Sequence, residues 1–521
     1  MTTLADEIAK VLRANNVTRI FGIPGGGSSL DLIDAVAKAD IPFTLTRTEA
    51  AATIMAAVTG ELTGAPGAVL VGVGPGASSA TNGLAYASLE RSPMVLFADG
   101  PASSMHQHFD QQALFAPITR GTARLEPNGG AARLDDLLKT ATASPEGPVM
   151  VEMTAGDADS AAPAYTPREG TVPPSASDAD IAAAKAMITE SKRPILIVGL
   201  EARPHADAVR AFADKLGAAA MTTYKAGGVI AADAPGFIGP ITGAAGEMPI
   251  LKHADLIIGV GFDAIEFIPG TWPDDYPPFL LLGEGSPENP RVPFDLQLTG
   301  SLDGTLRALD NGLCDTGWAA SGLAELRAIK DAIYAPQGSG FTTAAAVDVL
   351  SANVDHATRV TVDAGAHMFS TIGRWPAMRP FGIMKSNGLS TMGYALPAAI
   401  ASALANPETP VMAISGDGGI SMCIAELATA KELSLDITVV VMNDSALSLI
   451  DIKQQRQQRP SLGVRYPAQD LAAIAQAYGW NARRADTPDE LKDALALSGP
   501  KLIDVRVDPA GYGEDMARLR G

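Results

Sequence analysis

The chain has 521 residues, 47% hydrophobic and 19% charged, which is enough for about three domains that each bury a core. Its formal net charge of -19 argues against nucleic acid as a partner, because phosphate binding needs clustered Lys and Arg side chains. No apolar run reaches the roughly 18 residues of a membrane span. The two cysteines, Cys314 and Cys423, form no metal or redox motif, and the first residues lack the pattern of a signal peptide. We therefore expect a cytoplasmic protein.

Short apolar runs alternate with amphipathic helical patterns in three successive parts of the chain, which is typical of parallel α/β sheets. We predict three doubly wound parallel-sheet α/β domains, at residues 1–165, 178–330 and 341–521. A Pro-, Ala- and Ser-rich linker at about 156–177 and a second connection at 335–340 separate them. The expected strands are 19–23, 43–46, 67–73, 94–98, 149–153, 194–198, 256–260, 279–282, 359–363, 411–415, 438–442 and 502–505.

One βαβ unit near the C-terminus carries polar loops at both of its strand ends. Strand 411–415 runs into Gly416-Asp417-Gly418-Gly419, a helix is expected at about 421–433, and strand 438–442 stops at Asn443-Asp444. Open α/β sheets bind ligands at the carboxyl ends of their strands, so both loops lie where a ligand is expected.

The residue types in these loops suit a metal-bound diphosphate. Glycines such as Gly416, Gly418 and Gly419 let the backbone approach a diphosphate, and N–H groups at the helix start can donate to its oxygens. Asp417 and Asp444 offer hard oxygen ligands to Mg²⁺, with a backbone carbonyl and phosphate oxygens completing an octahedron.

With this loop pair the chain resembles the thiamine-diphosphate enzymes of the acetolactate synthase, pyruvate decarboxylase and benzoylformate decarboxylase superfamily. Further segments resemble that superfamily at 21–26, 47–52, 74–77, 192–194, 254–258 and 386–393. The resemblance implies a pyrimidine-binding, a central and a diphosphate-binding domain, with thiamine diphosphate and Mg²⁺ as cofactors. It also implies Asp417, Asp444 and the carbonyl of Ala446 as metal ligands. Asp444 stands where Asn is usual, but keeps a ligating oxygen.

The resemblance assigns roles to several residues outside these loops. Glu49 would hydrogen-bond the aminopyrimidine ring of the cofactor and promote loss of the C2 proton; alternatively, it is a first-turn acid favoured by the helix dipole. Met392 would wedge beneath the cofactor, or simply fill a gap in the core. The Ser390 carbonyl would accept from the 4′-amino group, and Ala366 and His367 would lie near the diphosphate.

Further cofactor contacts are expected at Gly25, Gly26, Gly76, Leu447 and Ile450. Gln107 and Gln111 match active-site glutamines of superfamily members and are predicted catalytic residues. His106 and His108 could act as acid or base, although an isolated His is more often a surface or packing residue.

Several departures from the superfamily bear on the reaction. Pyruvate decarboxylases carry a Glu where this chain has Ile450, next to Leu449, so transfer to a second carbonyl is favoured over aldehyde release. Gly72 replaces a catalytic His of benzoylformate decarboxylases. Thr48 replaces the usual His beside the catalytic Glu, and Ser79 replaces the Asn of the GPG loop, so the identity of the substrate stays open. We expect an acetolactate synthase-like carboligase or lyase acting on 2-oxo acids or related acyl donors and a carbonyl acceptor. A non-oxidative 2-oxo acid decarboxylase and a catalytically silent homologue are the alternatives.

The central domain lacks the signals of nucleotide binding. Flavin-binding acetolactate synthases hold FAD through a glycine-rich loop and a Gly-Ala-Arg-Phe-like segment. The corresponding segments here read Gly-Leu-Glu-Ala-Arg at 199–203 and Gly-Phe-Asp-Ala at 261–264, without the further glycines of the loop and without the Arg of the second segment, so FAD is not expected. A nicotinamide dehydrogenase is disfavoured because no GxGxxG opens a βαβ unit. Superfamily members build the cofactor site between two subunits, which implies a homodimer or homotetramer. The donor, the acceptor, the stereochemistry and the choice between dimer and tetramer stay open.

Overall fold

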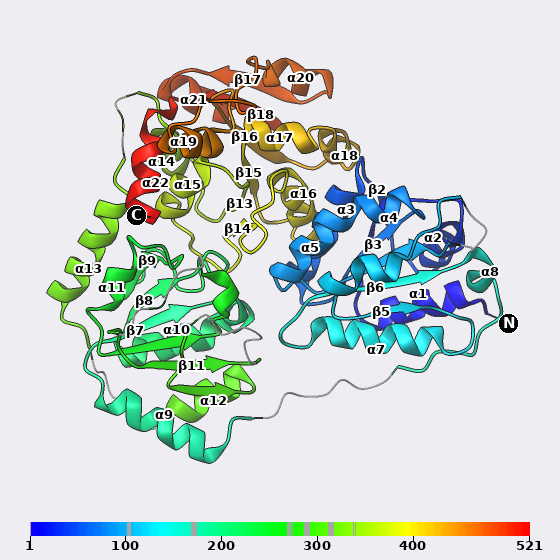
Figure 1. Cartoon of the computed structure of the whole chain (residues 1–521), viewed down its shortest axis with the longest axis horizontal. Helices are drawn as coiled ribbons and strands as arrows, with labels where there is room; N and C mark the ends of the chain where they lie inside the picture. Colours follow the sequence, from blue (N-terminus) through cyan, green and yellow to red (C-terminus); the bar gives the residue numbers. More distant parts are fainter. Residues whose placement is uncertain are drawn as a thin grey trace. The chain divides into compact units, whose positions relative to one another are not determined.

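The computed structural model describes residues 2–101, 106–167, 175–267, 272, 275–285, 292–310, 317–336, 338 and 340–520; Cys314 lies outside them. The described residues form three six-stranded parallel sheets, each flanked by helices (Figure 1). This confirms the predicted fold class of three parallel-sheet α/β domains. The limits of these domains, at 1–165, 178–330 and 341–521, stay predictions.

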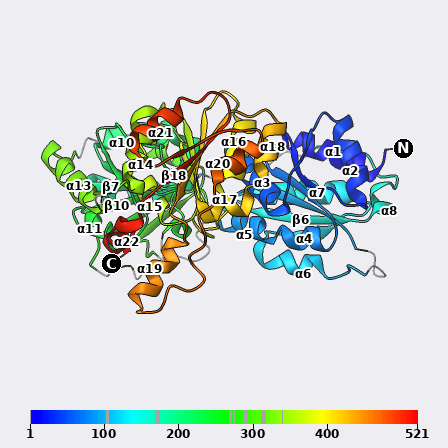
Figure 2. The same ribbon diagram turned by 90° about the horizontal axis from the view of Figure 1, so that it is seen from above.

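The first sheet has the order β2-β1-β3-β4-β6-β5. Its strands are β1 Ile20–Ile23, β2 Phe43–Leu45, β3 Gly67–Val71, β4 Met94–Asp99, β5 Thr122–Arg124 and β6 Pro148–Met153. The accompanying helices are α1 Leu4–Ala14, α2 Ser28–Lys38, α3 Glu49–Thr63, α4 Pro75–Ser79, α5 Thr81–Leu89, α6 Gln111–Phe115, η1 Ala116–Ile118, α7 Gly130–Thr142 and α8 Ala155–Ala158. Helices α1 and α2 lie on one side of β6 and α4 and α6 on the other (Figure 2), so both faces of this sheet are covered.

The second sheet has the order β12-β11-β10-β7-β8-β9, so the direction of strand progression reverses between β10 and β7. Its strands are β7 Pro194–Val198, β8 Ala219–Thr222, β9 Phe237–Pro240, β10 Leu256–Val260, β11 Phe279–Gly283 and β12 Leu296–Thr299. The accompanying helices are α9 Asp178–Glu190, η2 Leu200–His205, α10 Ala206–Leu216, α11 Met248–Leu251, η3 Ala264–Glu266, α12 Leu302–Asp310 and α13 Ala320–Ile333.

The third sheet has the order β14-β13-β15-β16-β18-β17, which repeats the topology of the first sheet. Its strands are β13 Arg359–Val362, β14 Ile383–Lys385, β15 Val411–Gly416, β16 Ile437–Asn443, β17 Asn481–Ala485 and β18 Lys501–Arg506. The helices of this part of the chain are α14 Thr343–Asn353, α15 His367–Arg374, α16 Ala395–Ala405, α17 Asp417–Cys423, α18 Glu426–Glu432, α19 Ser448–Arg456, α20 Leu471–Ala477, α21 Pro488–Leu495, η4 Pro509–Gly511 and α22 Tyr512–Arg520.

The predicted strands are all present, and where their ends differ the shift is one or two residues. The single helix predicted at 421–433 is wrong, because the segment forms two helices, α17 and α18. At the break, the N–H of Leu427 bonds to the carbonyl of Ile424, three residues back, which tightens the turn. The carboxylate of Glu426 at the start of α18 binds backbone N–H groups of the N-terminal domain, and these tertiary bonds outweigh the helical pattern.

Described residues of the predicted linker contact the N-terminal segment. Ala161 forms an antiparallel bridge with Thr3, and the N–H of Tyr165 donates to Glu7 at 2.7 Å. Helix α9 then begins at Asp178, with the Ser177 side chain as its cap. Residues 168–174 of this segment lie outside the described residues.

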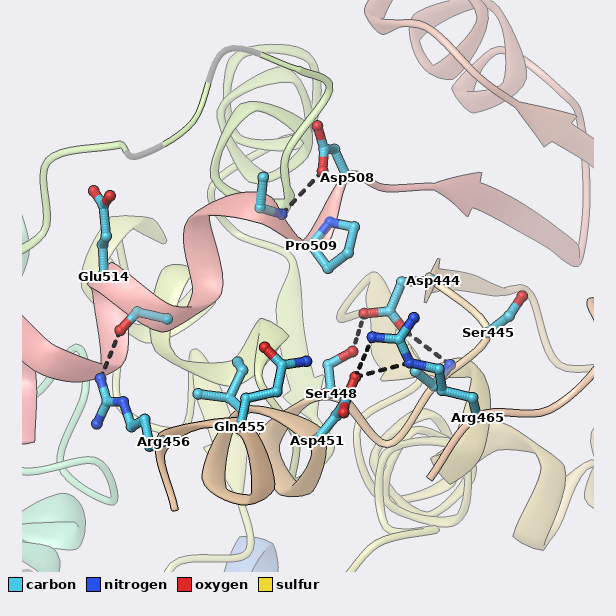
Figure 3. Close-up of a pocket in the computed structure, with 14 residues that line it drawn as sticks. Asp444, Ser445, Ser448, Asp451, Gln455, Arg456, Arg465, Asp508, Pro509 and Glu514 are labelled. Atoms are coloured by element: carbon cyan, nitrogen blue, oxygen red, sulfur yellow. Dashed lines mark hydrogen bonds and ion pairs between the residues drawn. The ribbon is translucent and has the colours of Figure 1, made fainter. Parts of the chain in front are cut away.

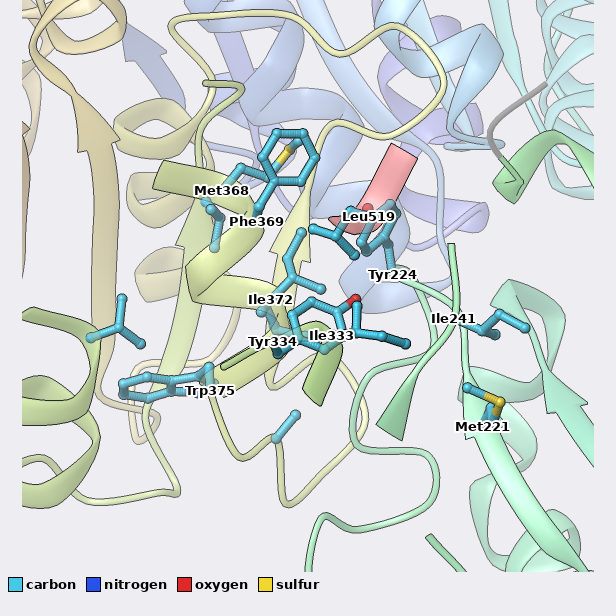
Figure 4. Close-up of a cluster of buried hydrophobic side chains, with 14 of the residues drawn as sticks. Met221, Tyr224, Ile241, Ile333, Tyr334, Met368, Phe369, Ile372, Trp375 and Leu519 are labelled. Carbon is cyan, nitrogen blue, oxygen red and sulfur yellow. The ribbon is translucent and has the colours of Figure 1, made fainter. Parts of the chain in front are cut away.

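The chain folds into two compact units. We call them unit 1, comprising Met1–Thr171, Gly388–Glu408 and Ile420–Ile437, and unit 2, comprising Val172–Asn387, Thr409–Gly419 and Thr438–Gly521. In unit 1, helix α16 packs against α3. In unit 2, one apolar cluster joins Met221 of β8 and Tyr224, which follows β8, to Phe369 and Ile372 of α15 (Figure 4). The central and C-terminal thirds of the chain thus share a core in unit 2. Among the described residues, no helix has the length and apolar character needed to cross a membrane.

Candidate active site

Two acidic loops follow neighbouring strands of the third sheet, as predicted from the sequence. Asp417 begins α17 directly after β15, and Asp444 directly follows β16. Asp417 Oδ2 accepts the N–H of Ser445 at 2.8 Å, and Asp417 Oδ1 accepts the N–H of Gly418 at 3.0 Å. These bonds fix the Asp417 carboxylate between the two loops.

The second loop is held in a sharp turn. Asp444 Oδ1 accepts the N–H of Ala446 at 3.1 Å, and its other oxygen accepts the hydroxyl of Ser448. Ala446 forms an antiparallel bridge with Arg465. In the part of the chain that the structure describes, no group donates a hydrogen bond to the carbonyl of Ala446, so this oxygen is available to a cation.

Burial and a neighbouring negative charge destabilise the charged form of Asp417. Burial and the charge of Asp444 raise the pKa of Asp417 to about 6, and burial raises the pKa of Asp444. Burial and the charge of Asp417 also raise the pKa of the nearby Tyr466 hydroxyl. A divalent cation between the two carboxylates would relieve this repulsion.

The donor set fits Mg²⁺ bound together with a phosphate group. Across the described ranges, no group of three or more His, Cys, Asp or Glu side chains gathers to hold a metal. Mg²⁺ commonly binds through one or two carboxylates plus phosphate oxygens, whereas an all-protein cage would need more ligands. Asp417, Asp444 and the Ala446 carbonyl match that requirement.

A buried histidine lies beside the first acidic loop. His367 begins α15, after β13, and a Cβ placed on Gly416 would lie 3.3 Å from the imidazole ring. The ring is 3% exposed, and its Nε2 has no hydrogen-bond partner among the described residues. Burial lowers the pKa of His367 to about 4, so the ring is neutral near pH 7. An unpaired buried nitrogen at this position fits a polar cofactor, and Ala366 directly precedes it.

Two of the predicted cofactor-binding glycines also have roles within the chain. A Cβ on Gly419 would lie 2.3 Å from Asp363 Oδ2, so only glycine lets α17 pack this closely on the end of β13. Asp363 Oδ2 accepts the hydroxyl of Ser415 at 2.8 Å. The N–H of Gly418 already donates to Asp417. The cofactor contacts of Gly418 and Gly419 stay predictions.

A cavity of about 570 Å³ adjoins the second acidic loop (Figure 3). It is lined by the Asp444 loop, by α19 and by the residues around η4. Its two arginines already have partners: Arg465 binds Asp451 at 2.7 Å, and Arg456 donates to the carbonyl of Gly513 at 2.7 Å. Leu447 and Ile450 lie at the start of α19, where Ile450 is 44% exposed.

The predicted catalytic acid lies at the start of a helix in unit 1. Glu49 is the first residue of α3, and the Thr48 hydroxyl caps this helix by accepting the N–H of Ala51 at 3.2 Å. A Cβ on Gly76 would lie 3.6 Å from Glu49 Oε1, so the structure brings these two predicted residues together. Glu426 accepts the N–H groups of Arg47 and Thr48, both at 3.0 Å.

The turn after β1 closes on an acid of the first sheet. A Cβ on Gly25 would lie 2.1 Å from Asp99 Oδ2, and the Asp99 carboxylate accepts the N–H groups of Gly27 and Ser29. Gly26 has open space where a side chain would project. Only Gly26 of this pair therefore faces room for a ligand, and both cofactor contacts stay predictions.

The two predicted catalytic glutamines differ in their surroundings. Gln111 is 1% exposed, and its amide accepts the N–H of Gly74 and donates to Glu152 Oε2 and to the Asp99 carbonyl. Through these bonds Gln111 stabilises the loop before α4. Gln107 is only partly buried and contacts the same Gly74 through its own Cβ and carbonyl. His106 and His108 are exposed.

The segment with Ser390 and Met392 is anchored to α5 in unit 1. Asn82 and Thr391 exchange side-chain hydrogen bonds, and the N–H of Gly388 donates to Glu90 at 2.8 Å. Ser390 has a φ of 53°, a left-handed conformation that is costly for a non-glycine residue. Met392 is partly buried, and its contact with the cofactor stays a prediction.

The candidate residues fall into both compact units. Unit 1 holds Gly25, Gly26, Glu49, Gly76, Gln107, Gln111, Ser390 and Met392, and unit 2 holds Ala366, His367, the 416–419 loop and the 444–450 segment. The sequence reading missed Glu426 and Tyr466. No local motif marks either residue, because their partners are distant in sequence. Glu426 accepts the N–H groups of Arg47 and Thr48, and Tyr466 lies near Asp417.

Comparisons with known proteins agree with this geometry. Residues 2–117 match the N-terminal TPP binding domain of thiamine pyrophosphate enzymes, residues 181–309 match the central domain, and residues 363–505 match the C-terminal TPP binding domain. The chain belongs to the thiamine pyrophosphate enzyme family. The predicted resemblance and the thiamine-diphosphate cofactor are thereby confirmed.

Relatives align along nearly the whole chain. The acetolactate synthase of Bacillus subtilis is 30% identical over 97% of this chain and 93% of its own length. A catabolic acetolactate synthase of Raoultella terrigena is 28% identical over 97% and 95%. A probable 2-ketoarginine decarboxylase of Pseudomonas aeruginosa, AruI, is also 28% identical over 97% and 94%. The chain is thus an acetolactate synthase-like enzyme of this family.

Proposed function

We propose that the chain uses thiamine diphosphate and Mg²⁺ to join or cleave a carbon–carbon bond next to a carbonyl, acting on 2-oxo acids or related acyl donors. The observation that carries this proposal is the Asp417–Asp444 pair at neighbouring strand ends, beside the Ala446 carbonyl, to which none of the described residues donates a hydrogen bond. The full-length similarity to acetolactate synthases supports the substrate class.

Six of the predicted residues have a defined role in this proposal. Asp417, Asp444 and the Ala446 carbonyl would hold Mg²⁺, and Gly416 and His367 would contact the diphosphate. When bound, thiamine diphosphate supplies an electron sink for the bond next to the carbonyl. Glu49 holds a hydrogen bond to the aminopyrimidine ring.

The choice between carboligation and decarboxylation rests on α19. Ile450, which is 44% exposed, offers no proton donor where pyruvate decarboxylases carry a Glu. Without a donor for the acyl carbon, transfer to a second carbonyl is favoured over release of an aldehyde. The similarity to a probable 2-ketoarginine decarboxylase makes non-oxidative decarboxylation the second candidate.

We further propose a homodimer or homotetramer in the cytoplasm. The support for the oligomer is the resemblance to a superfamily whose members complete the cofactor site with two subunits. The two cysteines lie far apart in sequence, which suits a reducing compartment.

A product screen tests the reaction. The purified chain, loaded with thiamine diphosphate and Mg²⁺, is offered pyruvate, glyoxylate, benzoylformate or acyl-CoA donors with several aldehydes, and products are identified by mass spectrometry. We expect a carboligation product from at least one 2-oxo acid, and none after chelation of the metal. Release of aldehydes alone would favour the decarboxylase. Absence of turnover, with no exchange of the C2 proton of the cofactor, would favour the silent homologue.

A further inference from the structure

In the central domain, a side chain of the chain itself fills the crevice in which folds of this kind bind ligands. In the order β12-β11-β10-β7-β8-β9, strand progression reverses between β10 and β7, and open α/β sheets bind ligands at the strand ends beside such a point. Glu266, the last residue of η3, lies there with only 1% of its surface exposed. It follows β10 by a short turn.

One carboxyl group joins the ends of three adjacent strands. Glu266 Oε2 accepts the N–H of Leu200 at 3.0 Å and the N–H of Asp263 at 3.3 Å, and Oε1 accepts the hydroxyl of Thr223. Leu200, Asp263 and Thr223 follow β7, β10 and β8 respectively. Backbone N–H groups at strand ends are the donors with which such folds bind ligand phosphates. Here they are already satisfied from within the chain.

The crevice is also tightly packed around the carboxyl group. A Cβ on Gly199 would lie 2.5 Å from Glu266 Oε2 and 2.4 Å from the Cα of Phe262. A Cβ on Gly261 would lie 2.4 Å from the N of Ala202. The glycines let the two loops close on each other, and the space between them is occupied.

We propose that Glu266 takes the place of a nucleotide phosphate, so that the central domain is closed to FAD and other nucleotides and is held together by its own acid. This inference goes beyond the proposed function and does not depend on it, since it concerns a crevice that the reaction does not use. It explains why the central domain can dispense with a bound nucleotide: the strand ends that a phosphate would join are joined by Glu266.

The protonation state of Glu266 is compatible with this role. Burial, with the charge of Asp263 as a lesser cause, raises the pKa of Glu266 to about 8, so near neutral pH much of the group is the neutral acid. A neutral carboxyl still accepts both N–H groups and shares its proton with the hydroxyl of Thr223. Removal of the side chain takes the acceptor from two buried donors, the N–H of Leu200 and the hydroxyl of Thr223, and from the part-buried N–H of Asp263.

The test compares the full-length wild-type chain with Glu266→Ala and Glu266→Gln. Binding of FAD and ADP is measured by equilibrium dialysis, and Tm is measured with acetate or inorganic phosphate against sodium chloride at equal ionic strength. We expect no saturable binding of either nucleotide to the wild type. The Tm of Glu266→Ala falls by roughly 5 °C or more, and acetate or phosphate restores part of this loss.

Glu266→Gln is the matched control. Its amide keeps the volume of the side chain, so the crevice stays filled and its Tm responds to acetate no more than that of the wild type. The proposal would be overturned if the wild type bound FAD or ADP saturably and the Gly199→Val substitution abolished this binding. An acetate response of Glu266→Ala no larger than that of the wild type would also overturn it. If Glu266→Ala does not fold, the nucleotide measurement on the wild type and Glu266→Gln still decides.

Discussion

The Glu426 carboxylate accepts the backbone N–H of Thr48 at 3.0 Å, directly before the predicted catalytic Glu49. The same carboxylate accepts the N–H of Arg47 at 3.0 Å and the hydroxyl of Thr429 at 2.7 Å. Glu426 is fully buried, and burial raises its pKa. The start of α3, and therefore Glu49, is fixed by a residue of the segment that follows the Gly416–Gly419 loop.

We predict that Glu426→Ala lowers kcat about 10- to 100-fold, because small displacements of a catalytic group cost on that order. KM for the 2-oxo acid should change less, since Glu426 touches no substrate. Glu426→Gln, which keeps one acceptor oxygen, should recover part of kcat. Steady-state kinetics with saturating cofactor provide the measurement.

The matched control is Glu432→Ala, which removes an exposed acid of the same helix that pairs with Arg47. Exposed ion pairs contribute little, so its kcat should stay within about twofold of the wild type. Equal losses in the two variants would contradict a positioning role for Glu426.

The second prediction concerns Glu49 itself. Glu49→Gln should abolish turnover, because the amide cannot stabilise the protonated aminopyrimidine ring as a carboxylate does. Mg²⁺-dependent binding of thiamine diphosphate, followed by quenching of tryptophan fluorescence, should be largely intact. Turnover near the wild-type rate would remove Glu49 from the mechanism.

The fold was predictable where strands are buried on both faces. Residues 194–198 form such a strand, and an unbroken apolar run marks it in the sequence. Six strands were not predicted: β5, β8, β9, β12, β14 and β17. Among them β8 is the exception to this rule, because it is buried throughout, but its four residues Ala219–Thr222 include two alanines, which have low strand propensity. The others carry weaker signals. β17 contains Arg483 and Arg484, is mostly exposed, and exists through its parallel pairing with β18. β5 and β14 are three residues long and also lie at or near sheet edges. Such strands are defined by their neighbours, which the local sequence does not show.

The residues of the candidate site also differ in whether the sequence could predict them. Asp417 and Asp444 could be found because each directly follows a strand, so their proximity depends only on sheet order. Glu426, Tyr466 and Glu266 could not be found, since their partners lie in other elements. Gln111 was identified by resemblance, yet its amide is engaged in holding Gly74 and Glu152.

The two glutamines therefore give a third prediction. Gln111→Ala should lower the stability by about 1–3 kcal/mol, because it removes the donor to Glu152 Oε2 and the acceptor of the Gly74 N–H, while Gln112 still donates to Glu152 Oε1. Gln107→Ala should leave Tm nearly unchanged while lowering kcat/KM, if its side chain meets the substrate. Thermal melts of both apo variants beside their kinetics separate the two roles. A stable but inactive Gln111→Ala would reverse the assignment.

Asn387 gives a fourth prediction, because it leads into the segment with Ser390 and Met392. Its Nδ2 donates to the backbone carbonyl of Glu266 at 3.0 Å, and its Oδ1 accepts from Lys385 at 3.1 Å. Asn387→Asp keeps the acceptor but replaces the donor by a negative charge facing a carbonyl. The Kd for thiamine diphosphate should rise roughly 10-fold.

The control for Asn387 is Asn353→Asp, which alters an exposed amide on α14 that donates to the carbonyl of Val349. Its cofactor affinity should equal that of the wild type in a fluorescence titration. If Asn387→Asp also binds the cofactor like the wild type, the contact with Glu266 does not position this segment.

The last prediction follows from the repulsion between Asp417 and Asp444. The pKa of Asp417 is raised to about 6 in the folded apo chain, above its unfolded value of 3.8. Between about pH 4 and 6 the unfolded chain ionises while the folded chain keeps its proton, so this group makes the apo protein less stable as pH rises. Asp444→Asn removes one charge and should raise the apo Tm at pH 7 relative to the wild type.

Metal binding should reverse this order. Mg²⁺ with thiamine diphosphate neutralises both carboxylates of the wild type, which should then gain more Tm at pH 7 than Asp444→Asn gains. Asp451→Asn is a control for which the apo Tm should change in the opposite direction. Hydrogen bonds from Ser461 and Arg465 lower the pKa of Asp451, so loss of this carboxylate should lower the apo Tm at pH 7. Melting curves from pH 4 to 8, with chelator or with Mg²⁺ and cofactor, provide the comparison. An apo Tm of Asp444→Asn at or below that of the wild type at pH 7 would show that the two carboxylates do not repel, and the case for a cation between them would fail.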